Sequence, residues 1–384
     1  MKIKNGICFL LCLAMVASCV HHAAKSTERQ IFSSAYIARD FGEQDWKGLV
    51  WAPYNDCWRG NTLHDDAMDI SHAGIKWVRV FFRSDSSDAA LDLLVQHCND
   101  AGVKIIAAYK KSYPKNDLGT PGQQLKDSAR LAFLVARYKN NIHYWEIHNE
   151  PNLHGRYWEL GKNAGQGSVD PEAPYNKGVH NYVQWLKLAY NTIKLQDANA
   201  TVVLGGLSSY MAEPFVKRLT AEQAYQYFDE VAYHPYATTP DKVTDSFLRF
   251  KAMMKTWPAP KNDLPVWITE IGFFVGKLGH KGLNNEAEKA QAMKSMYEKL
   301  MANMHWKRPI CWYLLHEEAP GKNYFNLTGL DSATGRKIFY PAYDTLRSMN
   351  KGWSYYKQQQ MLMMNASPGA AIHNDDKGNS GGAR

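Results

Sequence analysis

Two glutamates stand at the ends of strand-like runs in this sequence. Glu150 ends the run WEIHNE just before Pro151, and Glu270 ends the run VWITE shortly before Gly272. Two carboxyl groups presented in this way can break a glycosidic bond, because one protonates the leaving oxygen while the other attacks or stabilises the sugar carbon. We therefore take Glu150 and Glu270 as candidate catalytic residues.

Short β-rich runs alternate with amphipathic helical patterns along the chain, and most of the runs are apolar throughout. The expected strands are Leu49–Pro53, Ile75–Phe82, Val103–Tyr109, His143–His148, Thr201–Gly205, Phe228–His234, Val266–Glu270 and Ile310–Leu315. Continuous apolar runs are typical of strands buried on both faces, and regular alternation with helices indicates parallel βαβ units. The pattern predicts an α/β protein with a single (β/α)8 TIM barrel. An open doubly wound sheet is the alternative, but no Gly-rich phosphate loop supports it.

The two glutamates follow the fourth and seventh expected strands. In a barrel of this kind, the carboxyl ends of the strands form the catalytic face. Because the strands are assigned from apolar runs alone, this coincidence independently supports both residues. Long segments at 153–176, 274–284 and 317–327 also follow strands on this face, and such loops commonly set specificity.

The strand-four and strand-seven motifs resemble those of clan A glycoside hydrolases. Asn149–Pro151 looks like the strand-four motif of the clan, in which the glutamate is the general acid/base. The longer string Glu146–Asn152 is similar to the motif of glycoside hydrolase family 39, which usually has Trp where this chain has His148. Thr269–Gly272 resembles the nucleophile motif of families 39 and 5. Family 39 is therefore the nearest resemblance, and family 5 is the second.

Other residues match the same clan, and the resemblance extends from about residue 45 to 350. His234 and Tyr236 form the strand-six His-x-Tyr pattern of family 5, in which the Tyr contacts the nucleophile. Arg79 looks like the strand-two arginine that supports the nucleophile, although it could simply pair with another buried acid. Trp312 lies where the clan places an aromatic ring under the sugar, with core packing as the alternative.

The resemblance implies a retaining hydrolase that acts on a β-linked poly- or oligosaccharide by double displacement. Glu270 would be the nucleophile and Glu150 the acid/base, with a pKa raised by burial and by the neighbouring charge. Asn149 would bond the sugar 2-OH, and His148 would contact the substrate. Strict strand alternation puts Glu146 on the face shared by His148 and Glu150, as a supporting acid. Retention requires carboxyl groups about 5–5.5 Å apart, against roughly 6.5–9.5 Å for inversion.

Composition narrows the other classes of function. The net charge of +8 is spread over 384 residues without a dense basic stripe, so we expect no nucleic-acid partner. Fourteen histidines raise the idea of metal-dependent hydrolysis, but no HExxH or comparable spacing occurs, and we predict no metal and no cofactor. The alternatives to hydrolysis are a carbohydrate-binding barrel and a transglycosylating one.

Residues 1–19 have the pattern of a lipoprotein signal peptide. Lys2 and Lys4 precede the short apolar stretch Ile7–Val16, and the string VASC then ends at Cys19. This string resembles the bacterial lipobox, which implies lipidation of Cys19, a membrane partner through that lipid anchor, and a place in the bacterial cell envelope. Ordinary secretion with cleavage nearby is the alternative.

The remaining boundaries follow from composition. We expect a tether at 20–40, the catalytic barrel at 41–355, and a polar, Gly-rich, disordered tail at 356–384. Cys57, Cys98 and Cys311 lie beyond the signal without zinc-ligand spacing, and the last two sit in apolar runs typical of a core. One disulfide among the three is possible, but the sequence does not place it.

Overall fold

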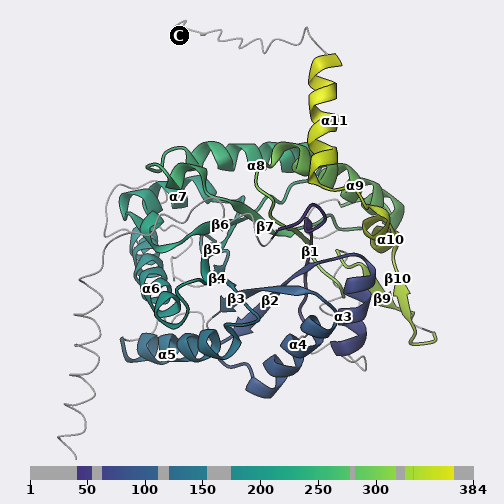
Figure 1. The fold of residues 1–384 in the computed structure, drawn as a ribbon. Coiled ribbons are helices and arrows are strands. Elements are labelled where there is room, and N and C mark those ends of the chain that lie inside the picture. Colours follow the sequence, from purple (N-terminus) through teal and green to yellow (C-terminus); the bar gives the residue numbers. More distant parts are fainter. Residues whose placement is uncertain are drawn as a thin grey trace, which may run out of the picture. The chain divides into compact units, whose positions relative to one another are not determined.

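The computed structural model describes residues 41–53, 63–110, 121–153, 174–276, 282–316, 325–331 and 333–366. Within these ranges the strands β1 to β8 are parallel, pair in chain order, and close into a barrel, as Figure 1 shows. The strands are β1 Lys47–Val50, β2 Trp77–Arg83, β3 Lys104–Lys110, β4 Tyr144–Asn149, β5 Thr201–Ser208, β6 Glu230–His234, β7 Val266–Ile271 and β8 Ile310–Trp312. The predicted TIM barrel is confirmed, and each expected strand overlaps an observed one.

Helices surround the barrel, and those from α3 to α9 connect successive strands (Figure 1). They are α3 Leu63–His72, α4 Asp88–Asp100, α5 Pro121–Tyr138, α6 Pro174–Gln196, α7 Ala212–Ala221, α8 Pro240–Met254, α9 Glu286–Asn303, α10 Pro341–Ser348 and α11 Trp353–Ala366, with 3-10 turns η1 Ala224–Tyr227 and η2 Lys261–Asp263. A hairpin of β9 Thr328–Leu330 and β10 Lys337–Phe339 follows the barrel. Among the helices in the described ranges, none is both long enough and apolar enough to cross a bilayer.

Side chains that point into the barrel fill its N-terminal end. One buried cluster takes a single residue from each of six neighbouring strands, and Phe41 joins it from the segment before β1. The ring of Phe41 stacks on that of Trp77 with centroids 5.0 Å apart, and the guanidinium of Arg308 lies 4.2 Å from the Phe41 ring centroid. Glu230 accepts hydrogen bonds from Arg308 and from the indole of Trp267. This end of the barrel is therefore a packed floor in which the buried charges are paired. The candidate catalytic residues lie at the other end, where the strands terminate.

The strand register is irregular at two places near the carboxyl ends. The β5–β6 pairing shifts between Leu204 and Leu207, and the β7–β8 pairing shifts between Ile268 and Ile271. In both strands the two residues that bracket the shift belong to the outer core, which the barrel forms with its helices. The residues between them, Gly205 and Gly206 on β5 and Thr269 and Glu270 on β7, are freed from strict alternation. Both irregularities lie beside the candidate catalytic residues.

Part of the expected disordered tail is helical. Helix α11 continues to Ala366, so the prediction of disorder from residue 356 is wrong for 356–366. Trp353 and Tyr356 are buried, and the ring of Tyr356 lies 6.4 Å from that of Trp46. The sequence does not reveal this anchoring, because the two rings are followed directly by the polar run KQQQ. Residues 367–384, the signal peptide with Cys19 and the tether all lie outside the described residues.

Candidate active site

Arg79 on β2 is the centre of a buried ion-pair network. Its Nε and Nη2 donate to the two carboxylate oxygens of Glu146 on β4, both at 2.7 Å. Nη2 also donates to Oδ1 of Asn149, and Nη1 donates to Oε1 of Glu270 on β7, again at 2.7 Å. Arg79 and Glu146 are fully buried. Arg79 therefore contacts Glu270, as its predicted role would require, and Glu146 fixes the arginine through two further hydrogen bonds.

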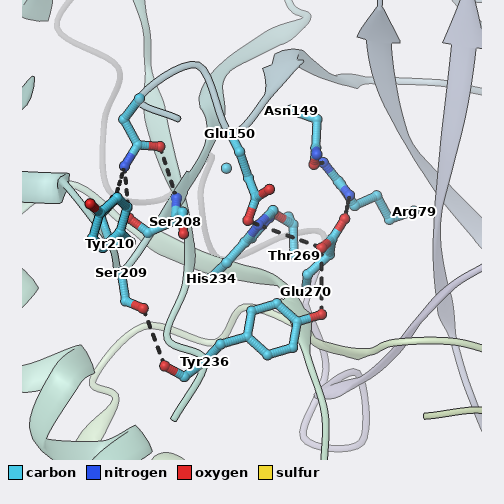
Figure 2. A network of polar contacts seen from close by, with 12 residues as sticks. Arg79, Asn149, Glu150, Ser208, Ser209, Tyr210, His234, Tyr236, Thr269 and Glu270 are labelled. Atoms are coloured by element: carbon cyan, nitrogen blue, oxygen red, sulfur yellow. Dashed lines mark hydrogen bonds and ion pairs between the residues drawn. The ribbon is translucent and has the colours of Figure 1, made fainter. Parts of the chain in front are cut away.

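Glu270 is in contact with three polar side chains, those of Arg79, Tyr236 and His234. Besides the Arg79 contact, the hydroxyl of Tyr236 donates to Oε2 of Glu270 over 3.5 Å, and Nδ1 of His234 lies 3.7 Å from the same oxygen. Burial raises the pKa of Glu270, and so does the nearby Glu150, whereas His234 and Arg79 act to lower it. Burial and the charge of Glu270 raise the pKa of Tyr236 well above its usual value, so this phenol remains a donor. Figure 2 shows these groups converging on one carboxylate.

Glu150 lies immediately beyond β4 in an unusual backbone conformation. Its φ is +46°, and its N–H donates to the carbonyl of Gly206 over 2.8 Å. Residues other than glycine rarely adopt positive φ, and when they do the strain is often found at functional sites. His234 lies between Glu150 and Thr269, with Nδ1 3.3 Å from Oε1 of Glu150 and Nε2 3.0 Å from Oγ1 of Thr269. The structure thus unites Glu150, Glu270, His234 and Tyr236 (Figure 2).

The two candidate carboxylates are close together. One oxygen of Glu150, one of Glu270 and a ring nitrogen of His234 all lie within 4.8 Å of one another. This proximity fits the shorter carboxyl spacing of retaining enzymes better than the wider spacing that accommodates a water molecule in inverting ones. Two carboxylates and an imidazole could also hold a divalent cation, although the Arg79 guanidinium beside Glu270 opposes a second positive charge there.

Gly206 on β5 makes this packing possible. A Cβ at this position would lie 2.1 Å from Nε2 of His234, which is far inside van der Waals contact. The N–H of Gly206 donates to Oε1 of Glu146 over 2.8 Å, and its carbonyl accepts from Glu150. One glycine therefore links the supporting acid, the candidate acid/base and the imidazole between the carboxylates.

His148 does not join the carboxylates in the way we expected. Its φ is +73°, which breaks the strict alternation of β4 after Ile147. The side chain is 1% exposed, and its ring lies 6.2 Å from that of Tyr182 on α6, outside the barrel wall. Asn149 takes the inward position instead and bonds Arg79. This placement does not fit the substrate contact predicted for His148. The inward side chain of Asn149 does fit the bond to a sugar hydroxyl that was predicted for it.

Trp312 also faces away from the site. It is fully buried in the outer core, with its ring 6.3 Å from that of Phe273, and its indole N–H donates to the carbonyl of Phe325 over 2.8 Å. Alternation continued from β8 puts Tyr313 on the inward face, where it lies near Tyr236. The expected ring under the sugar is therefore not Trp312, and the inward aromatic residue at this strand end is Tyr313.

An aromatic group absent from the predicted site lines the Glu270 side. The Phe325 ring lies 5.7 Å from that of Tyr313, 6.0 Å from that of Tyr236 and 5.4 Å from that of Phe274. A Cβ on Gly272 would lie 2.9 Å from Phe325, so the glycine after the nucleophile motif leaves space for this ring. The sequence signal was the segment 317–327 after strand eight, of which residues 317–324 lie outside the described part.

Comparison with known proteins gives structural neighbours without sequence relatives. No protein-family model matches the sequence, and no curated protein matches it. A family 39 glycoside hydrolase from the gut symbiont Bacteroides cellulosilyticus WH2 is 18% identical with a TM-score of 0.61, over 80% of this chain and 64% of that one. A β-galactosidase from the psychrophilic Marinomonas ef1 is 12% identical with a TM-score of 0.57, over 84% and 60%. A family 1 β-glucosidase from Thermotoga maritima is 12% identical with a TM-score of 0.54, over 83% and 98%.

These likenesses establish a shared fold. The neighbours include glycoside hydrolases of families 39 and 1, which belong to the clan that the motifs resemble. The chain spans less than two thirds of the length of the first two neighbours.

Proposed function

We propose that the chain is a retaining glycoside hydrolase that cleaves a β-linked poly- or oligosaccharide by double displacement. The observation that carries the proposal is the pair Glu150 and Glu270 at the ends of β4 and β7, with one carboxylate oxygen of each within 4.8 Å of the other. Arg79 and Tyr236 bond Glu270, as a nucleophile requires. The fold, shared with glycoside hydrolases, is consistent with this activity.

In the first step, a carboxylate oxygen of Glu270 attacks the anomeric carbon and forms an ester bond. The bond between that carbon and the leaving oxygen breaks, and Glu150 transfers its proton to this oxygen. Positive charge develops on the sugar ring while the charge of Glu270 is consumed. Asn149, oriented by its bond to Arg79, has an amide N–H group available for a sugar hydroxyl.

In the second step, a water molecule attacks the anomeric carbon and the ester bond to Glu270 breaks. Glu150, now ionised, accepts the proton of that water. Formation of the ester removes the negative charge of Glu270, so ionisation of Glu150 becomes easier at this stage. His234 stays beside both carboxylates and restricts their positions throughout the cycle.

The first test is sugar release from a broad polysaccharide panel by the wild type and by Glu270→Gln. We expect release by the wild type and a fall in kcat on the order of a thousandfold or more in the variant, because the amide cannot form the ester. NMR of the first product formed should show retained configuration. Equal release by both proteins, or an inverted product, would contradict the assignment of Glu270.

A second variant separates the two glutamates. Glu150→Ala should lose about 10²–10⁴-fold in kcat on substrates whose leaving group needs a proton. On a substrate whose leaving group needs no proton, added azide should restore turnover and yield the β-azide product, since azide attacks the glycosyl-enzyme in place of water and needs no general base. The same rescue in Glu270→Ala, with a β product, would reverse the roles that we assign.

Two other functions remain as outcomes of the same experiments. A carbohydrate-binding barrel would bind glycans with similar affinity in the wild type and in Glu270→Gln and would release no sugar. A transglycosylating enzyme would form longer products from the same intermediate. Loss of activity on chelation would instead favour a cation held by Glu150, His234 and Glu270.

We further propose that the enzyme is attached to the bacterial cell envelope through a lipid on Cys19. The support is the order of charged residues, short apolar stretch and VASC string within residues 1–19. A surface-held hydrolase suits a substrate too large to enter the cell.

A further inference from the structure

Tyr210 is an exposed aromatic residue at the catalytic end of the barrel. Its side chain is 63% exposed, and it lies in the short connection between β5 and α7. The other large apolar side chains that are exposed in the described ranges lie on the helices or on the β9–β10 hairpin. Scattered surface rings of that kind need no explanation, but a ring at a strand-to-helix connection of the catalytic face is placed to meet a ligand.

The backbone at Tyr210 is tied to the loop that carries Glu150. The amide nitrogen of Asn152 donates to the carbonyls of Ser208 and Tyr210 at 2.8 and 2.7 Å, and its oxygen accepts from the N–H of Ser208 at 3.0 Å. Asn152 is 2% exposed, so these bonds form away from water. They use both amide hydrogens and the carbonyl oxygen of that side chain.

A second tie joins the connection to β6. The hydroxyl of Ser209 donates to the carbonyl of Tyr236 over 3.2 Å (Figure 2). The connection is thus fastened on one side to the residue two places after Glu150 and on the other to the residue that bonds Glu270. The backbone that carries the Tyr210 ring is therefore held in a fixed position relative to both carboxylates.

We propose that Tyr210 forms the subsite for the leaving-group sugar, so that the substrate is a glycan with a sugar on both sides of the cleaved bond. This inference rests on the proposed function. Glu150 gives its proton to the leaving oxygen, so the leaving group lies on the Glu150 flank. Asn152 ties Tyr210, which follows the neighbouring strand β5, to that flank, while Asn149 bonds Arg79 on β2, on the opposite side of β4 in the barrel order.

The chemistry of the side chain fits a sugar. The face of a pyranose that carries axial C–H bonds packs on an aromatic plane, and the phenol hydroxyl can bond a ring hydroxyl at its edge. A tyrosine loses little conformational freedom when it is covered, since only two side-chain torsions are fixed. The same subsite would accept a second sugar as acceptor, so Tyr210 would also promote transfer to sugars over transfer to water.

The test compares two leaving groups on one sugar. The glycosyl fluorides of β-glucose, β-galactose, β-xylose and β-glucuronic acid would be screened, and the one that turns over would be paired with the β-linked oligosaccharide of the same sugar. Fluoride is too small to reach Tyr210 and leaves without a proton. In Tyr210→Ala we expect kcat/KM to fall roughly tenfold or more for the oligosaccharide, from the lost stacking, and less than about threefold for the fluoride.

Matched variants control for indirect effects. Tyr210→Phe keeps the ring and should retain most of the oligosaccharide activity. Tyr355→Ala removes a ring that is 41% exposed on α11, and it should leave kcat/KM unchanged for both substrates. An unchanged oligosaccharide rate in Tyr210→Ala, or an equal fall for the fluoride, would overturn the proposal. If the wild type turned over no fluoride and no oligosaccharide, the proposed function itself would fall, which is a distinct result.

Discussion

Arg79 sets the charge balance of the site at the scale of single residues. It bonds two carboxylates, Glu146 and Glu270, so the buried group of three carries more negative than positive charge when both acids are ionised. Glu146 takes the two-pronged contact and Glu270 takes a single one. Under the proposed function, the single contact leaves Glu270 able to react, while the two-pronged contact keeps the arginine fixed.

Burial of Glu270 predicts a trade-off between stability and activity. Its pKa is raised in the folded state, so the folded protein binds this proton more tightly than the unfolded chain does. The associated stability is present below the usual Glu pKa of about 4.3 and is lost as pH rises through the raised value. Glu270→Gln should therefore unfold at a higher temperature than the wild type at pH 7, and the difference should shrink toward about pH 4.

Glu146→Gln is the matched control, because Glu146 is the better paired acid. Removing its charge leaves the buried Arg79 with one carboxylate and should cost about 3 kcal/mol of unfolding free energy at pH 7. Thermal unfolding at pH 7 and at about pH 4 gives the unfolding temperatures of both variants and of the wild type. A Glu270→Gln protein less stable than the wild type at pH 7 would show that the Arg79 contact outweighs the burial.

Residue types were easier to predict than residue directions. Glu150, Glu270, Arg79, His234 and Tyr236 were all found from motifs, and the structure brings them together. The directions of His148 and Trp312 were predicted wrongly. A positive φ takes His148 out of the strand alternation. In the run ICWYLL every residue is apolar, so the sequence does not show which side chains point inward. Tyr210 was missed because no local pattern separates an exposed tyrosine from a buried one.

At the scale of elements, β5 is the strand on which the site geometry depends most. Gly206→Ala would push a Cβ to 2.1 Å from His234, so the imidazole or the strand must move. We expect a stability loss of about 1–3 kcal/mol from the added volume, and a fall in kcat/KM of about a hundredfold from displaced catalytic groups. Steady-state kinetics and thermal unfolding measure the two effects.

Gly42→Ala provides the comparison for that variant. A Cβ at position 42 would meet its nearest atoms at 3.9 Å, which is ordinary contact, so this variant should match the wild type in both measurements. Full activity in Gly206→Ala would show that β5 and His234 can separate without disturbing Glu150.

The elements themselves were largely readable from the sequence. Apolar runs identified each barrel strand, because strands covered on both faces are apolar throughout. Strand ends were less certain, and the two register shifts could not be foreseen, since they depend on pairing between strands. Helix α11 was missed because its polar stretch conceals two anchoring rings, Trp353 and Tyr356.

At the scale of the whole molecule, we expect a lipid on Cys19 to attach the protein to a membrane. In a bacterium that processes lipoproteins, the chain should label with radioactive palmitate and fractionate with membranes. Cys19→Ala should abolish the label and release the protein into the soluble fraction, with unchanged turnover of a small substrate. Unlabelled wild-type protein would instead favour ordinary secretion.

Phe41 gives the polypeptide a defined point of entry. It reaches the barrel at the floor, against Trp77 and Arg308, while the candidate catalytic glutamates lie at the opposite ends of the strands. A substitution at position 41 would therefore act on the packing of the floor and would leave the surroundings of Glu150 and Glu270 in place.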